Sequence, residues 1–257
     1  MPRVQPFSGA NAAMLTGDVI FTSAIMSDTS NTSNQVIYVT NFQELVGTPY
    51  QGDKNAVCWK REPMGDFAEI IQKVPLTGNI TVVEETELRA LQLSEQGQIA
   101  RDTLLQDLQD LRDHGAAPVL NIIKNYDEDD GFPFFPTDVY SYHVDRSPVP
   151  TDTILCTYYG DSSEILPNAQ VKQKILIPEI RAELRKLYDG DDAGFEAFLT
   201  DNFFDLHYQA EPGAQPLTLG NGHLWRLAVD HPGSDVLPCV HRAPKEKSGL
   251  YRLLLIC

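Results

Sequence analysis

The segment "YHVDRSPVPTDTILCTYYG", residues 142–160, combines a chemical motif with a strand-like run. His143 and Asp145 are separated by one residue, and in extended backbone the side chains at i and i+2 point to the same face. Val144 then points to the opposite face. The apolar, β-branched and aromatic run at 153–159 predicts a strand directly after the motif. A His-x-Asp match is common by chance, so the motif needs support from the rest of the chain.

Strand-like runs surround this segment on both sides. Many short strands with turn signals, and helices mostly outside the run, favour a mainly β protein with helical support, an α+β chain with a β-sandwich or jelly-roll core. The stretch "ITVVEE" (80–85) is either a strand or the start of a helix. The predicted strands are "VIYVTNF" (36–42), "AVCWKR" (56–61), "APVLNIIKNY" (117–126), "VYSYHVD" (139–145), "DTILCTYYG" (152–160), "KQKILIP" (172–178), "PLTLGNGHLWRLAVDH" (216–231), "VLPCVHRAP" (236–244) and "LYRLLLIC" (250–257).

Besides the short helix that "DFAEIIQKV" (66–74) predicts, two longer regions carry helical patterns. Residues 94–115 place leucines at helical spacing, with Ser94 to cap the start and Gly115 to end the helix, which predicts an amphipathic helix covering one face of a sheet. Residues 178–205 predict a helical insertion. We therefore expect an N-terminal arm and helical support region at 1–116, which includes a Ser/Thr/Asn loop at 27–35, and a β core at 117–257.

Composition excludes several classes of partner. The net charge of −16 repels nucleic acid and anionic membrane surfaces. None of the four cysteines forms a Cys-x-x-Cys pair, which favours a reducing compartment. No signal-peptide pattern and no membrane-length apolar run is present, so we expect a cytoplasmic protein, with its oligomeric state open.

Two further residues near the C-terminus support the motif. His241 ends a strand-like run, and Arg252 lies within the apolar run "LYRLLLI". We expect a hairpin between them, with "KEKSG" (245–249) as its turn. A buried guanidinium is costly unless it is paired, so Arg252 requires either an internal carboxylate or an anionic ligand.

His143, Asp145 and His241 together form a set of two histidines and one carboxylate, which is typical of non-haem Fe(II) sites with open coordination positions. With Arg252 beyond the second histidine, the chain resembles the Fe(II)/2-oxoglutarate-dependent oxygenase superfamily over residues 117–257. The segments "AVCWKR", "CTYYGDSSEILPN" and "CVHRAP" more loosely resemble an uncharacterised bacterial domain family, which indicates no substrate.

The resemblance implies a double-stranded β-helix in which the three residues bind Fe(II) and Arg252 binds the distal carboxylate of 2-oxoglutarate. It implies O₂ as the oxidant, hydroxylation of an unactivated C–H of a small, amino-acid-like molecule, and succinate and CO₂ as co-products. The gap between Asp145 and His241 is long for the family, which is why the helical segment 178–205 is interpreted as an insertion.

Candidate residues around this centre come from the neighbouring runs. Thr157 and Tyr158 are assigned to the cosubstrate, and Tyr159 to the substrate; aromatic core packing is the alternative for either tyrosine. Further candidates for substrate binding or for adding positive charge are Arg146, Arg242, Trp225 and Arg226, with surface salt bridges and core packing as the alternatives.

Rival ligands and rival functions stay open at this point. His207, His223 and His231 are alternative ligands, of which His223 is the strongest although no carboxylate lies two positions from it. A cupin-like metalloenzyme would use the same triad without 2-oxoglutarate and would pair Arg252 internally. A non-catalytic β-sandwich binding module would use these histidines structurally.

Overall fold

The computed structural model describes residues 34–129, 131, 132, 134–247 and 249–257. The expected arm at 1–33, and with it most of the predicted loop at 27–35, lies outside the described residues. About 30% of the chain is helical and about 25% is in strands, so the protein is mixed α/β rather than mainly β.

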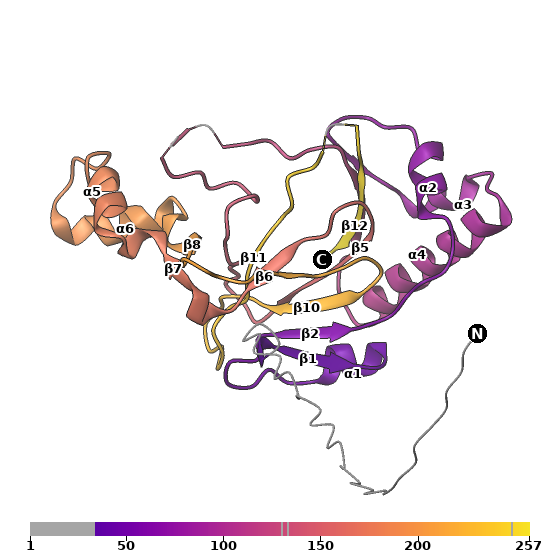
Figure 1. Cartoon of the computed structure of the whole chain (residues 1–257), viewed down its shortest axis with the longest axis horizontal. Coiled ribbons are helices and arrows are strands. Elements are labelled where there is room, and N and C mark those ends of the chain that lie inside the picture. Colours follow the sequence, from indigo (N-terminus) through magenta and orange to yellow (C-terminus); the bar gives the residue numbers. More distant parts are fainter. Residues whose placement is uncertain (1–33, 130, 133, 248) are drawn as a thin grey trace, which may run out of the picture.

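The centre of the molecule is a seven-stranded sheet with the order β1-β2-β10-β5-β12-β4-β3 (Figure 1). Strands β1 and β2 are parallel, and every other neighbouring pair is antiparallel. The strands of this sheet are β1 (Val36–Val39), β2 (Ala56–Trp59), β3 (Ile80–Val82), β4 (Val119–Ile123), β5 (Asp152–Tyr159), β10 (Leu224–Ala228) and β12 (Arg252–Ile256).

The region before residue 117 therefore supplies three strands of this sheet as well as helices. The predicted strands at 36–42 and 56–61 form in part, and "ITVVEE" begins as strand β3. A boundary at 116 does not separate a helical support from a β core, because β2 pairs with β10 and β3 pairs with β4, and both partners lie beyond it.

Four helices cover one face of the sheet. These are α1 (Phe42–Gly47), α2 (Phe67–Lys73), α3 (Glu85–Ala90) and α4 (Glu95–Asp113). Alternation along the strands separates the two faces: Val57 and Ile122 pack against the helices, whereas their neighbours Cys58 and Ile123 pack on the other side.

Helix α4 begins and ends where the sequence predicts. The Ser94 hydroxyl accepts a hydrogen bond from the amide of Gly97 at 3.1 Å, which satisfies one of the free amides of the first turn. At the other end Gly115 adopts a φ of 93°, which an L side chain rarely adopts, and its amide bonds the carbonyl of Arg112 at 2.8 Å.

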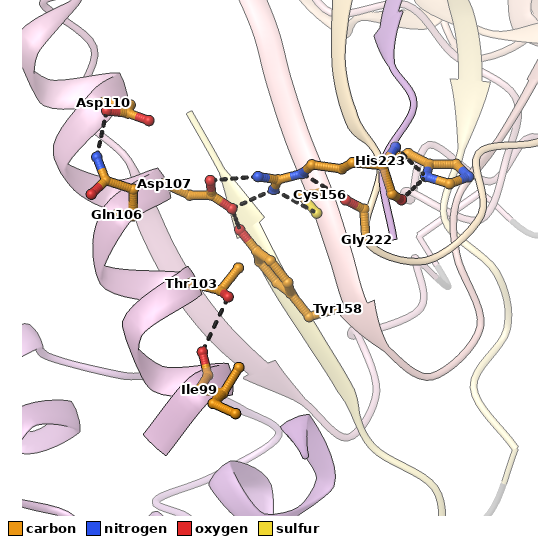
Figure 2. Close-up of polar contacts among 10 residues, drawn as sticks. Ile99, Thr103, Gln106, Asp107, Asp110, Cys156, Tyr158, Gly222 and His223 are labelled. Atoms are coloured by element: carbon orange, nitrogen blue, oxygen red, sulfur yellow. Dashed lines mark hydrogen bonds and ion pairs between the residues drawn. The ribbon is translucent and has the colours of Figure 1, made fainter. Parts of the chain in front are cut away.

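A buried ion pair joins α4 to the sheet (Figure 2). Arg61 follows β2, and both of its terminal nitrogens contact the Asp107 carboxylate, which is 3% exposed. The hydroxyl of Tyr158 donates to the same carboxylate, and Arg61 Nε donates to the carbonyl of Gly222 at 2.8 Å. The pair thereby links α4, β5 and the turn before β10.

A second layer of strands faces the other side of the large sheet. It is a three-stranded sheet of order β11-β6-β9, made of β6 (Glu164–Leu166), β9 (Leu217–Thr218) and β11 (Val240–Arg242). Ile165 of β6 packs in one cluster with Leu155, Trp225 and Leu254 of the large sheet. This cluster fills the space between the two sheets.

A helical unit forms one end of the molecule, opposite α2 to α4 (Figure 1). It contains α5 (Pro178–Arg185) and α6 (Asp192–Asp201), with the 3-10 turns η2 (Asn168–Gln170), η3 (Lys174–Leu176) and η4 (Phe204–Leu206). Strands β7 (Val171–Gln173) and β8 (Tyr208–Ala210), which flank the two helices in the chain, pair as a two-stranded antiparallel sheet. The unit's own apolar cluster includes Phe135, Leu184, Phe195 and Phe204. The predicted helical segment at 178–205 is therefore helical.

Three local predictions are wrong. The run "KQKILIP" leaves the strand at Lys174 and forms a 3-10 turn. The segment 139–145 makes only two isolated bridges, both at His143, to His207 and to His241. No hairpin joins His241 and Arg252, because β11 and β12 belong to different sheets and the connection crosses from one sheet to the other.

Within the described part of the chain, no helix combines the length and the hydropathy needed to cross a bilayer.

Candidate metal centre

The segment that carries His143 and Asp145 is held between two other segments. His143 and His241 exchange two backbone hydrogen bonds of 2.9 Å, and the amide of Val144 donates to the carbonyl of Leu206 at 3.1 Å. Val144 is buried on the opposite side, in a cluster with Val240. The alternation expected from the sequence therefore holds without a regular strand, and His143 and Asp145 point the same way.

The three predicted ligands come together from segments far apart in the sequence. His143 Nε2 lies 4.0 Å from Asp145 Oδ1, and His241 Nε2 lies 3.6 Å from Asp145 Oδ2. The two imidazole centroids are 4.5 Å apart, and one ligand atom from each residue lies within 4.8 Å of the other two. These separations suit three donors around one ion.

Backbone carbonyls orient both imidazoles. His143 Nδ1 bonds the carbonyl of Ser141 at 2.7 Å, and His241 Nδ1 bonds the carbonyl of Cys239 at 3.1 Å. A carbonyl can only accept, so both Nδ1 atoms carry the proton and both Nε2 lone pairs face the carboxylate. The Thr153 hydroxyl donates to Asp145 Oδ2 and fixes the third member. Such outer hydrogen bonds are the usual support of a metal ligand set.

The electrostatics leave His143 and Asp145 in their metal-binding protonation states. Burial, and then the proximity of His241, lower the pKa of His143 to about 4. Burial alone would raise the pKa of Asp145, but His241 and the Thr153 hydroxyl lower it below its usual value. At neutral pH the first imidazole is therefore neutral and the carboxylate is ionised. The side chain of Asp145 is 37% exposed and that of His241 only 10%, so solvent reaches the triad from the Asp145 side.

Arg252 is the largest fully buried side chain among the described residues, with 1% of its surface exposed. Its Nη2 donates to the hydroxyls of Ser163 at 2.7 Å and of Thr157 at 3.3 Å. Its Nε and Nη1 are buried and lack a hydrogen-bond partner among the described residues. Burial lowers its pKa, which measures the cost of holding an unpaired cation there.

Thr157 and Tyr158 point to opposite faces of β5, as alternation of side chains along a strand requires. Thr157 contacts Arg252. Tyr158, the other predicted cosubstrate residue, lies on the opposite face instead and bonds Asp107 (Figure 2). Its ring stacks on that of Phe67, with ring centroids 5.2 Å apart. Tyr159 is 37% exposed at the end of β5.

Three of the four other candidates are committed to internal partners. Arg146 bonds Asp205 and Asp230, and Arg242 bonds Glu164. Trp225 is buried between the sheets and donates to the carbonyl of Leu219 at 2.8 Å.

The fourth, Arg226, also has internal partners: it bonds Asp152 at the start of β5 at 3.2 Å and the carbonyl of Val46 on α1 at 3.2 Å, and it lies 4.5 Å from the centroid of the Tyr50 ring. The structure therefore does not direct Arg226 toward the triad, and it does not add positive charge there.

Of the three rival histidines, His223 and His231 lie away from the triad, and only His207 lies beside it. His223 bonds the backbone of Arg61 near the buried ion pair, and His231 bonds the carbonyl of Pro232 in a turn. His207 is buried beside His143, with ring centroids 5.8 Å apart, and burial lowers its pKa to about 3. His207 is one of the alternative ligands named from the sequence, but no sequence signal places it beside His143, because the contact depends on the segment after α6 returning there.

The residues present fit a divalent first-row metal ion. Two neutral imidazoles and one carboxylate provide three donors on one side and leave the other coordination positions to small molecules. Comparison of the chain with protein-family models, with curated proteins and with solved structures gave no match.

Proposed function

We propose that the chain is a non-haem Fe(II)- and 2-oxoglutarate-dependent oxygenase, with the two facing sheets as a double-stranded β-helix. The observation that carries the proposal is the convergence of His143, Asp145 and His241, with both imidazoles fixed by Nδ1 so that Nε2 faces the carboxylate. A non-catalytic module would have no need for this shared orientation.

The location of Arg252 supports the cosubstrate. His241 of β11 pairs with Ile165 of β6, and Ile165 packs in the apolar cluster between the two sheets. Leu254 of β12 packs in the same cluster and points to the same face of its strand as Arg252. His241 and Arg252 therefore face one interior from opposite sheets. A dicarboxylate that reaches from the metal to the guanidinium would satisfy the two unpaired nitrogens of Arg252.

Each residue then has a defined task. His143, Asp145 and His241 hold Fe(II) through one side of its coordination sphere. Arg252, with Ser163 and Thr157, binds the distal carboxylate of 2-oxoglutarate and excludes water from it. When bound, Fe(II) and 2-oxoglutarate supply oxidation of an unactivated C–H by O₂, with succinate and CO₂ as co-products. We propose hydroxylation of a small molecule as the outcome.

Calorimetric titration of 2-oxoglutarate into the Fe(II)-loaded protein under anaerobic conditions tests the proposal. We expect saturable binding that glutarate, which lacks the keto group, reproduces only weakly. Arg252→Met should abolish it, and Arg89→Met, an exposed arginine on α3, should leave it unchanged. Equal affinity for glutarate and 2-oxoglutarate would refute chelation through the keto acid, and full binding by Arg252→Met would refute the anchor.

A further inference from the structure

A hollow of about 560 Å³ lies beside the metal centre but does not include its imidazoles. Its wall contains Ser141, Tyr142 and Arg242, which are neighbours of His143 and His241 in the chain, together with Tyr208 and Lys174. The volume is typical of a site for a small organic molecule. The function proposed above assigns no role to it.

Lys174 is the unusual member of this wall. Its ammonium group donates to the Ser141 hydroxyl at 2.7 Å and lies 3.5 Å from the carbonyl of Pro136, with the Phe135 ring centroid 4.9 Å away. An ammonium has three donors, so one remains for a ligand. Among the described residues, no carboxylate forms an ion pair with Lys174, although the chain as a whole is strongly acidic.

The other cations around the hollow already have partners. Glu164 neutralises Arg242, and Glu128 pairs with Lys245 at 3.1 Å. Two further carboxylates lie in the wall and are held by local donors rather than by a cation. Asp138, whose charge acts on Lys174, accepts the backbone amides of Asp129, Tyr140 and Ser141, and Asp129 accepts the amides of Gly131 and Thr137 and the Thr137 hydroxyl. Lys174 is therefore the cation in this wall that lacks an anion of its own.

Aromatic side chains form much of the remaining wall. The hydroxyl of Tyr142 is bound to Glu164 and that of Tyr140 to Glu246 at 2.8 Å, so their polar ends already have partners. The rings of these residues and of Tyr208 offer apolar surface to a bound molecule.

We propose that this hollow binds a small organic carboxylate with an apolar or aromatic body, and that the Lys174 ammonium is its charge partner. The site requires no metal and no 2-oxoglutarate, so it stands or fails separately from the oxygenase. Ser141 connects this site to the metal centre, because its hydroxyl accepts a hydrogen bond from Lys174 and its carbonyl accepts one from His143 Nδ1.

Titration of benzoate and of benzamide into the metal-free protein tests the proposal, because the two probes share a shape and differ in charge. We expect benzoate to bind at least tenfold more tightly than benzamide, since a charge-assisted hydrogen bond is about that strong. Lys174→Met should weaken benzoate at least tenfold and Lys174→Arg should retain it. Lys172→Met, two positions earlier and exposed on β7, is the matched control and should leave benzoate binding unchanged.

Equal binding of the two probes, or unchanged benzoate binding in Lys174→Met, would overturn the proposal. Loss of benzoate binding in Arg252→Met would also overturn it, because the acid would then occupy the Arg252 site. Denaturant midpoints of each variant, matched to wild type, ensure that a loss of binding is not a loss of fold. A site that binds benzoate in a protein that never binds 2-oxoglutarate would refute the proposed oxygenase alone.

Discussion

His143 and His241 exchange two backbone hydrogen bonds of 2.9 Å, which place their imidazole rings side by side with centroids 4.5 Å apart. Neither residue belongs to a long strand. The proximity of the two rings therefore depends on this single antiparallel bridge and on the Nδ1 contacts to Ser141 and Cys239.

Replacing either histidine should abolish metal binding. His143→Ala and His241→Ala each remove one of three donors, so we expect Co(II) affinity to fall about 100-fold or more, beyond the effect of losing an outer partner. Absorption spectra of the Co(II) protein measure this directly. His231→Ala, in a turn, is the control. Independent changes in stability with Co(II) binding retained would favour a structural role for the histidines.

Thr153→Val should weaken the site without removing a ligand. The hydroxyl of Thr153 donates to Asp145 Oδ2 and helps keep that carboxylate ionised and oriented. Valine keeps the shape and removes the donor, so we expect Co(II) affinity to fall about tenfold. Competition with a chelator measures the affinity; no change would show that Asp145 needs no orientation.

The metal-free protein should lose stability as the pH falls from about 6.5 to 4. Burial lowers the pKa of His143 to about 4 and that of His207 to about 3, so in this window the unfolded chain binds protons that the folded chain does not. Each histidine then adds up to about 1.4 kcal/mol of destabilisation per pH unit. Urea unfolding at several pH values across this range gives the free energy of unfolding as a function of pH. This free energy should fall less steeply with pH in His207→Gln than in wild type or His231→Gln. Equal pH dependence in all three proteins would contradict the burial of a neutral His207.

Loss of one charge from the Arg61–Asp107 ion pair beneath α4 should strongly destabilise the folded protein. Asp107→Asn leaves the Arg61 guanidinium buried without its partner, which typically costs about 3–5 kcal/mol. Asp110→Asn, one turn away and bonded only to Gln106 among the described residues, is the matched control and should change the free energy of unfolding little. Substituting both members, as Arg61→Met with Asp107→Leu, should recover most of the loss. A small effect of Asp107→Asn in urea unfolding would show that Arg61 finds another partner.

The Arg252→Met variant should show whether Arg252 binds a ligand or forms an internal ion pair. Two guanidinium nitrogens are buried without partners among the described residues, so their removal should leave the free energy of unfolding of the ligand-free protein unchanged or raised. In wild type, binding of 2-oxoglutarate with Fe(II) should raise the free energy of unfolding by mass action. In the variant, the same addition should leave the free energy of unfolding unchanged. A large loss of stability in ligand-free Arg252→Met would favour the cupin-like alternative, in which Arg252 has an internal partner.

The sequence predicts what depends on local pattern. Helix α4 follows from leucine spacing, Ser94 and Gly115, and the common direction of His143 and Asp145 follows from alternation in extended backbone. Strands β5, β10 and β12 follow from their short apolar runs, which in β5 also contain β-branched and aromatic residues.

Non-local pairing accounts for the rest. The sequence around His241 and Arg252 fits a hairpin equally well, and only the pairing of β11 with β6 and of β12 with β4 and β5 separates them into two sheets. Tyr158 and Thr157 are indistinguishable by pattern until α4 covers one face of β5. The partnership of Arg61 with Asp107 depends likewise on where α4 packs.

The most direct measurement is the visible spectrum of the protein with Fe(II) and 2-oxoglutarate under anaerobic conditions. We expect a weak charge-transfer band that requires both additions, that disappears in His241→Ala, and that is lost in Arg252→Met while Fe(II) remains bound. Fe(II) bound at His143, Asp145 and His241 with no such band at saturating 2-oxoglutarate would contradict the proposed function.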